Sequence, residues 1–380
     1  MATVYNTYTI VADAGAGPAP FLDRQRVHVA RRRTRFDSNI FMPGISANRP
    51  TMKDVAKLAG VSLNVVSRVC RPEDNEAVSA SARGRVLAAV EELGYHPDSR
   101  ARSLRNQRTN TIGFFIAYNW LSVEGSAFAR SIYEGLQAGC SSARQDLLFI
   151  HGMNLGSDKE IVRELNNAKV DGVVYLPNIG ERGLSETLLC IQKPMIRIGE
   201  PHSGMPTIVT EDHYGGQRLA RHLYLRGHRR VLFRMPPYSL TTAERRRDGF
   251  AETAEELGMT VVTTLTESLC DELSSEERQL LNSIRSERIT AAACWRDESA
   301  AQLLVFCRES GIHVPDDLAV VGFDGLTPSF CPPDLRLTTV VIDWQRITET
   351  AVATLIDIIE GKAAPDEVVQ PCSIYLGNTT

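Results

Sequence analysis

The sequence predicts an all-α helix-turn-helix domain followed by an α/β region of two doubly wound lobes. Two short helices joined by a glycine are expected after residue 50, and from residue 111 short apolar runs alternate with helix-length amphipathic segments. Charge divides the chain in the same way, because residues 1–110 hold 17 Lys and Arg against 10 Asp and Glu, and the remainder holds 25 against 36. The positive charge therefore lies with the helix-turn-helix, where phosphates would be met.

The composition is typical of a soluble protein with more than one domain. At 380 residues the chain exceeds the size at which a single core stops growing, roughly 250–300 residues. Hydrophobic residues make up 43% and charged residues 23%, and no apolar run approaches the roughly 20 residues that span a bilayer. We therefore expect two or three domains, a cytoplasmic location and no membrane contact.

The cysteines lie far apart in the chain and form no C-x-x-C pair. This spacing indicates neither a zinc site nor a disulfide scaffold. Reduced thiols in a cytoplasm fit it best, and we expect no metal and no cofactor. The eight positions are Cys70, Cys140, Cys190, Cys270, Cys294, Cys307, Cys331 and Cys372.

Residues 1–48 are predicted to be disordered. The segment Gly15–Pro20 is rich in glycine and proline, and Arg31–Arg35 is a solvated basic run without an apolar stretch after it. Two interpretations remain: a basic arm that adds phosphate contacts, or an upstream translation start assigned in error, with Met42 as the true start. We favour the second.

The helix-turn-helix is expected in residues 49–96. Thr51 and Asp54 have the spacing of a capping box, so the first helix begins at Met52. Gly60 permits a tight exit from that helix, and Ser62 is placed to cap the second. The first helix has an apolar stripe for packing, formed by Val55, Ala56, Leu58 and Ala59.

A third helix and a basic segment complete this part of the chain. The helix is expected from Ser79 to about Leu93, followed by Gly94 at its end. Its predicted buried residues are Val86, Leu87, Val90 and Leu93. The segment 97–110 could form a helix, but it is basic and nearly without apolar residues, so it cannot be stable alone in water.

From residue 111 to residue 380, buried parallel strands are expected to alternate with crossover helices. The first set of strands is Ile112–Ile116, Asp146–Ile150, Gly172–Leu176 and Met195–Ile198, and the second is Thr207–Val209, Arg230–Phe233, Thr260–Thr263, Ala291–Cys294 and Leu318–Phe323. The helices are Phe128–Ala143, Ile161–Lys169, Gly216–Arg226, Ala243–Leu257 and Glu298–Ser310. We expect the lobe boundary near 207–212 and a return of the chain near 340–345.

These residues resemble the LacI/GalR family of bacterial transcription regulators from Thr51 nearly to the end of the chain. The matching stretches are Lys53-Asp-Val-Ala-Lys-Leu-Ala-Gly-Val-Ser62, Val66-Ser-Arg68, Glu91-Glu-Leu-Gly-Tyr-His-Pro97, Ala101-Arg-Ser-Leu104, Val170-Asp-Gly-Val-Val174, Arg226-Gly-His-Arg-Arg-Val231, Val314-Pro-Asp-Asp-Leu-Ala-Val-Val-Gly-Phe-Asp324 and Leu337-Thr-Thr339. The resemblance implies an effector domain like periplasmic sugar-binding proteins and a homodimer on double-stranded DNA. Pairing of dimers into tetramers is left open.

The resemblance also assigns DNA-contacting residues. Leu63 and Asn64 take the positions that choose bases, and Arg68 takes the position of an arginine that contacts guanine. Asparagine can form two hydrogen bonds with adenine, and arginine can form two with guanine, so both residue types suit these roles. The remaining expected contacts are Thr51, Ser62, Val65, Ser67, Arg100, Ala101 and Leu104. Leu104 matches a leucine wedged between bases in the minor groove. Arg100 replaces a small apolar residue, so it either contacts phosphate or weakens hinge pairing.

In the effector domain the resemblance points to a ligand between the lobes, at the carboxyl ends of the strands. Arg246 matches an arginine that clamps the ligand, Asp324 matches an acid that receives sugar hydroxyls, and Trp344 lines the pocket. Arg296 and Asp297 replace the usual Asn-Asp. An alternative for Arg246 is a surface ion pair with Asp248.

The charge of this ligand has two interpretations. Two guanidiniums beside one small site are costly without an anion, so Arg246 and Arg296 favour a sugar acid or sugar phosphate. Alternatively, Arg296 pairs with Asp297 or Asp324 and leaves a neutral pocket for a plain sugar.

Together these patterns predict a DNA-binding transcription regulator, most readily a repressor, controlled by a sugar or sugar derivative. The alternative is a sugar-binding receptor of the periplasmic type without DNA function. An enzyme is not expected, because no phosphate-binding, nucleophile-elbow, zinc-protease or dinucleotide motif occurs.

Overall fold

The computed structural model describes two separate units of the chain. The described residues are 50–70, 78–96, 108–116, 126–152, 155, 157–177, 184–268, 271–283, 286 and 288–380. The chain divides after His96 into a small helical unit and a larger α/β unit. Residues 1–48 and most of the expected hinge lie outside the described residues, so what was expected of them stays a prediction.

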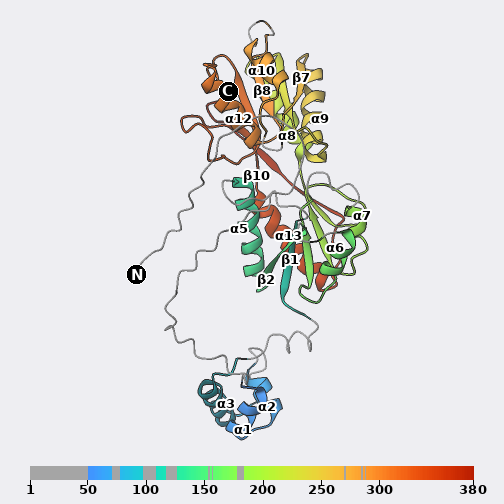
Figure 1. Ribbon diagram of the computed structural model, residues 1–380, viewed down its shortest axis with the longest axis vertical. Helices are drawn as coiled ribbons and strands as arrows, with labels where there is room; N and C mark the ends of the chain where they lie inside the picture. Colours follow the sequence, from blue (N-terminus) through green and yellow to red (C-terminus); the bar gives the residue numbers. More distant parts are fainter. Residues whose placement is uncertain are drawn as a thin grey trace, which may run out of the picture. The chain divides into compact units, whose positions relative to one another are not determined.

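The small unit contains three helices, α1 (Met52–Ala59), α2 (Leu63–Val69) and α3 (Ala80–Leu93) (Figure 1). Between α1 and α2, Gly60 has a φ of 62°, a left-handed conformation that glycine adopts with little strain. The backbone N–H of Val61 then donates to the carbonyl of Ala56 and closes the turn. The predicted helix-turn-helix is confirmed.

Two of the predicted core positions in this unit were wrong. Leu58 and Leu87 are 47% and 49% exposed, although both were placed on buried stripes. On each helix the buried face is centred on neighbouring positions, and these leucines lie at its edge. The residues that do form the buried core are Val55, Ala56, Ala59, Val66, Val69, Val86, Ala89 and Tyr95.

The first lobe of the larger unit is built on a six-stranded sheet in the order β11-β5-β4-β3-β1-β2. All its pairings are parallel, as expected for strands joined by crossover helices. The strands are β1 (Thr111–Ile116), β2 (Asp146–His151), β3 (Gly172–Tyr175), β4 (Met195–Ile198), β5 (Thr207–Thr210) and β11 (Glu367–Gln370), and the helices are α5 (Ala127–Ser142), α6 (Asp158–Leu165), α7 (Leu184–Leu188) and α13 (Trp344–Ile359).

The second lobe repeats this design in the order β12-β10-β9-β8-β6-β7. Among its described strands only β12 runs antiparallel, against β10. The strands are β6 (Arg230–Met235), β7 (Thr260–Leu265), β8 (Ala291–Cys294), β9 (Ala319–Asp324), β10 (Thr338–Ile342) and β12 (Cys372–Tyr375), and the helices are α8 (Asp212–Leu225), α9 (Thr241–Glu256), α10 (Ser275–Asn282) and α12 (Asp297–Glu309). The two lobes, with α5 and α13 packed together in the first, are visible in Figure 1.

The chain passes between the lobes three times. It leaves the first sheet after β5, returns between β10 and α13, and leaves again between β11 and β12. The return near 340–345 was predicted, whereas the last passage was not. The assignment of Thr207–Val209 to the second set of strands was wrong, because β5 pairs with β4 and β11 in the first sheet.

Two glycines let α8 and α9 pack in direct backbone contact. A Cβ atom on Gly216 would lie 2.1 Å from the carbonyl oxygen of Arg246, and one on Gly249 would lie 2.0 Å from that of His213. Any side chain here would push the helices apart. The close approach places Arg246, on α9, next to the start of α8.

None of the described helices is long and apolar enough to cross a membrane.

Candidate functional site

One side of α2 is exposed on the small unit. Val66 and Val69 turn the other side into the core, whereas Ser62, Leu63, Asn64 and Arg68 are exposed; we call these four residues the recognition face. Leu63 is an apolar side chain that is 44% exposed at the start of the helix. The arrangement leaves polar and apolar groups side by side on an α-helix, an element that the major groove of DNA is wide enough to admit.

Three other residues predicted to contact DNA are partly buried or already hydrogen-bonded within the protein. Val65 and Ser67 are half-buried at the edge of the recognition face. The Thr51 hydroxyl and backbone N–H both donate to Asp54, at 2.7 and 2.8 Å, and these bonds lower the pKa of the Asp54 carboxyl. While this pair is formed, Thr51 has no donor left for a phosphate. The remaining predicted contacts, Arg100, Ala101 and Leu104, lie outside the described residues.

The larger unit has a pocket where the two lobes face each other, with about 750 Å³ of empty space including its open side. Its walls come from the carboxyl ends of β3, β4, β6, β8 and β9, which is where ligands bind in open α/β sheets. We call it the interlobe pocket. Its lining residues are Phe128, Leu176, Pro177, Ile198, Gly199, Glu200, Tyr238, Leu240, Thr242, Arg246, Trp295, Arg296, Glu298, Asp324 and Trp344.

Aromatic rings form much of the apolar wall. Phe128 and Trp344 meet edge to face with centroids 4.8 Å apart, and Tyr238 and Trp295 do so at 6.4 Å. Two buried polar atoms of this wall, Trp344 Nε1 and Tyr238 Oη, have no hydrogen-bond partner among the described residues. Burial of an unpaired donor is unfavourable, so both atoms are suited to a polar group that enters the pocket.

Arg246 is held by two carboxylates. Its Nε donates to Asp212 Oδ1 at 2.8 Å, and its Nη1 donates to the carbonyl of Trp295 at 2.8 Å and lies 3.0 Å from Asp324 Oδ1. The guanidinium is 3% exposed and stacks over Phe323. The alternative pair with Asp248 does not form, because Asp248 binds Arg247 at 2.6 Å.

Asp324 is the acid of the pocket. Burial raises the pKa of its carboxyl to about 7, and the nearby Arg246 opposes that rise without cancelling it. A carboxyl that is half protonated near neutrality can accept or donate a hydrogen bond there.

Arg296 also has an internal partner, though neither of those expected. Its Nη2 lies 2.6 Å from Asp271 Oδ2, and Glu298 is 4.0 Å away. Burial alone would lower the pKa of Arg296, but the two carboxylates outweigh it and the pKa is raised. The guanidinium also stacks on Trp295, 4.4 Å from the ring centroid.

Asp297 lies beside the pocket and is not among its lining residues. It accepts the Thr339 hydroxyl at 2.7 Å and the Leu326 N–H at 2.6 Å, and it is 1% exposed. Burial, followed by the charge of Asp324, raises its pKa well above the usual range. Asp297 therefore joins α12 to β10 and to the turn after β9.

Four of the five residues predicted for the effector site, Arg246, Arg296, Asp324 and Trp344, lie together in the interlobe pocket. Residues that sequence reasoning missed are Tyr238, Glu298 and, behind the wall, Asp271. Tyr238 and Glu298 each lie within four residues of a strand's carboxyl end, a signal that could have found them. The described residues contain no cluster of His, Cys, Asp and Glu suited to a metal ion.

Comparisons with known proteins match both units. A family model described as bacterial regulatory proteins, lacI family, matches residues 51–98. A second, described as a periplasmic binding protein-like domain, matches residues 220–380. The matches cover the helix-turn-helix and most of the second lobe with the end of the chain.

Two curated relatives align over most of the chain. The transcriptional regulator GalR of Escherichia coli (strain K12) is 30% identical over 296 residues, which cover 76% of this chain and 83% of that protein. The transcriptional repressor PurR of Photobacterium profundum is 28% identical over 321 residues, covering 82% of this chain and 92% of that protein.

Solved structures show the same fold. A complex of the transcriptional regulator CelR with cellobiose has a TM-score of 0.64 at 25% identity and covers 87% of this chain and all of its own. The lac repressor dimer bound to operator and the anti-inducer ONPF has a TM-score of 0.72 at 23% identity and covers 87% and 99%.

Proposed function

The chain belongs to the LacI/GalR family of bacterial transcription regulators, and we propose that its recognition face and its interlobe pocket supply the two activities of a repressor controlled by a small molecule. It is a DNA-binding transcriptional repressor with an effector domain, and it is not an enzyme. The observation that carries the assignment is the helix-turn-helix with an exposed second helix, joined to a two-lobed domain with a pocket between its lobes.

In this proposal α2 enters the major groove of operator DNA. Asn64 and Arg68 are exposed and chemically suited to adenine and guanine, and Leu63 offers an apolar surface to a thymine methyl group. Ser62 and Ser67 contact phosphates and set the position of the helix without reading sequence.

The active species is a homodimer on an imperfect palindrome in the cytoplasm. Each recognition face reads one half-site, because a two-fold symmetric protein matches a two-fold symmetric site. Arg100, Ala101 and Leu104 belong to the hinge that pairs over the minor groove in the centre, where Leu104 kinks the DNA. A receptor without DNA function would have no use for the exposed α2.

The effector that fits the pocket best is a neutral, hydroxyl-rich molecule such as a sugar. Aromatic faces suit the apolar side of a sugar ring, while Glu200, Glu298 and Asp324 supply acceptors and Tyr238 and Trp344 supply donors. The two-guanidinium argument for an acidic ligand loses its basis, since Arg246 pairs with Asp212 and Asp324, and Arg296 with Asp271. The similarity to a regulator solved with cellobiose points the same way.

Selection from random double-stranded DNA tests the function. The full chain should enrich an imperfect palindrome, and Asn64→Ala should relax the choice of base at one symmetric pair of positions. Glu92→Ala, an exposed change on α3, should enrich the same site as the unaltered protein. Enrichment of no common sequence, or of the same sequence by Asn64→Ala, would contradict the proposal.

A further inference from the structure

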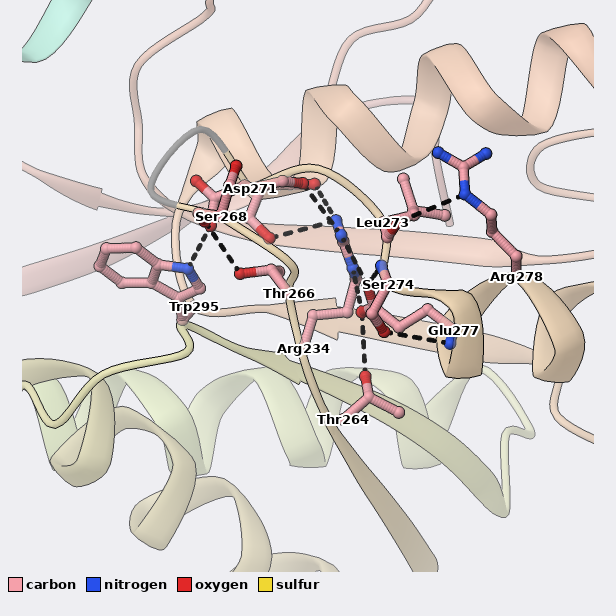
Figure 2. A network of polar contacts seen from close by, with 11 residues as sticks. Arg234, Thr264, Thr266, Ser268, Asp271, Leu273, Ser274, Glu277, Arg278 and Trp295 are labelled. Carbon is pink, nitrogen blue, oxygen red and sulfur yellow. Dashed lines mark hydrogen bonds and ion pairs between the residues drawn. The ribbon is translucent and has the colours of Figure 1, made fainter. Parts of the chain in front are cut away.

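A buried polar network, drawn in Figure 2, reaches the interlobe pocket through Trp295, which lines the pocket and hydrogen-bonds Asp271. At its centre Arg234, on β6, is fully buried and binds Glu277 through Nε at 2.7 Å and Nη2 at 3.2 Å. Glu277 also accepts the Thr264 hydroxyl at 2.9 Å and the Ser274 N–H at 3.0 Å. The charge of Arg234 is thus neutralised inside the network, and its other donors are available for the backbone.

Those donors hold two segments that border the pocket. Arg234 Nη2 donates to the carbonyl of Asp271 at 3.1 Å, and Nη1 donates to the carbonyl of Ser299 in the first turn of α12. Asp271 is the ion-pair partner of Arg296, and Ser299 lies three residues after Arg296 in the chain. The buried Arg234 guanidinium therefore fixes the backbone at Asp271 and the backbone close to Arg296.

Asp271 divides its carboxylate between two pocket residues. Its Oδ1 accepts the indole N–H of Trp295 at 2.8 Å, and its Oδ2 accepts Nε of Arg296 at 2.7 Å. Asp271 itself is 1% exposed and is not a lining residue, whereas Trp295 and Arg296 both line the pocket. It therefore acts on a ligand through those two side chains.

We propose that Asp271 is a specificity-determining positioning residue, which cancels the charge of Arg296 and orients Trp295 so that the pocket accepts a neutral ligand and rejects an anion. This inference rests on the interlobe pocket being the effector site of the proposed function. Loss of the Asp271 charge would remove the nearer of the two carboxylates that pair with Arg296, at 2.6 Å against 4.0 Å for Glu298, and would make the electrostatic potential at the pocket more positive.

The substitution Asp271→Asn isolates this charge. Asp271 has a left-handed backbone with a φ of 58°, which asparagine tolerates better than most residues. An asparagine oxygen can still accept the Trp295 N–H, and Arg234 holds a backbone carbonyl that the substitution leaves in place. The change therefore removes one negative charge and preserves the local conformation.

Inorganic phosphate serves as the anionic probe, because it needs neither the natural effector nor DNA. Calorimetric titration of the full-length protein at constant ionic strength should show phosphate binding on the order of tenfold tighter to Asp271→Asn than to the unaltered chain. The matched control Asp248→Asn removes a carboxylate from the exposed pair with Arg247 and should bind phosphate no better than the unaltered chain. The double variant Asp271→Asn/Arg296→Gln should lose the gain.

Equal phosphate affinity in Asp271→Asn and the unaltered chain, or a gain that survives in the double variant, would overturn the proposal. If Asp271→Asn does not melt cooperatively, Asp271→Gly takes its place with the same controls, because glycine adopts the positive φ of this position and also lacks the charge. Equal phosphate affinity in Asp271→Gly and the unaltered chain would likewise overturn the proposal. A failure here leaves operator binding by the unaltered chain intact, so it is distinguishable from failure of the proposed function.

Discussion

Glu211 Oε2 accepts the backbone N–H of Cys372 at 3.1 Å, and this bond joins two of the three passages between the lobes. The Glu211 N–H in turn donates to the carbonyl of Gln370 at 3.2 Å. The first and third passages are therefore hydrogen-bonded to each other at the point where the chain changes lobe.

We expect Glu211→Ala to loosen this connection. The free energy of unfolding should fall by about 1–3 kcal/mol, because a partly buried N–H loses its acceptor. Hydrogen exchange at the Cys372 amide should become faster, which mass spectrometry of the C-terminal peptide measures. Glu367→Ala, an exposed change on β11, should alter neither quantity; a similar loss in both variants would contradict a specific role for Glu211.

Arg68→Ala should weaken binding to the selected operator by about 1–3 kcal/mol and leave binding to random DNA nearly unchanged. The physical reason is that one bidentate base contact is lost and few phosphate contacts are. Gel-shift titrations at one fixed salt concentration measure both affinities. Arg83→Ala removes the same charge from α3 and should keep the ratio of specific to random affinity. An equal loss on both DNAs for Arg68→Ala would show that this arginine does not read sequence.

Asp324 should make the stability of the effector domain depend on pH. Its pKa is raised from 3.8 to about 7, so between these values the folded protein binds a proton that the unfolded chain does not. The contribution of Asp324 to the free energy of unfolding is therefore fully present at low pH and is lost as the pH rises towards and through about 7, with a slope of up to about 1.4 kcal/mol per pH unit.

Urea unfolding between pH 5 and 8 measures this contribution, as the difference between the unaltered chain and Asp324→Asn. Relative to the variant, the unaltered chain should lose stability as the pH rises. A difference that is flat across the range would mean that burial does not shift this carboxyl.

Gly249→Ala should separate α8 from α9. The new Cβ would lie 2.0 Å from a backbone oxygen of α8, which cannot move aside as a flexible side chain could. Overpacking of this kind lowers stability by about 1–3 kcal/mol. Thermal melting measures the loss, and Glu255→Ala on the exposed side of α9 is the control. Unchanged melting of Gly249→Ala would show that the two helices adjust freely.

Local patterns predicted most of the elements, and the errors arose from contacts between distant residues. Each strand of the first lobe up to β4 was found from a short apolar run bounded by polar residues. Assigning β5 to a sheet required knowledge of its partner β11, which begins 160 residues later at Glu367 and was not predicted. Strand pairing over such a separation leaves no mark within either segment.

The sequence likewise allowed part of the candidate site to be predicted, but not the contacts between residues that are distant in the chain. Arg296, Asp324 and Trp344 lie at or within two residues of the carboxyl ends of β8, β9 and β10, so strand order could place them in one pocket, whereas Arg246, on α9, was placed there by the resemblance alone. The pairing of Arg296 with Asp271 could not be predicted, because Asp271 lies in an irregular loop 25 residues earlier with no periodicity. That pairing nevertheless decides the net charge of the pocket.

The third passage between the lobes also determines when the protein can fold during synthesis. Residues 367–370 complete the first sheet and residues 372–375 complete the second, so both sheets lack an edge strand until these residues have been made. Thr379 follows them and is fully buried, and its hydroxyl donates to the carbonyl of Val320. Both sheets can therefore be completed only after residue 375 has emerged from the ribosome, whereas all three helices of the helix-turn-helix unit are available once residue 96 has emerged.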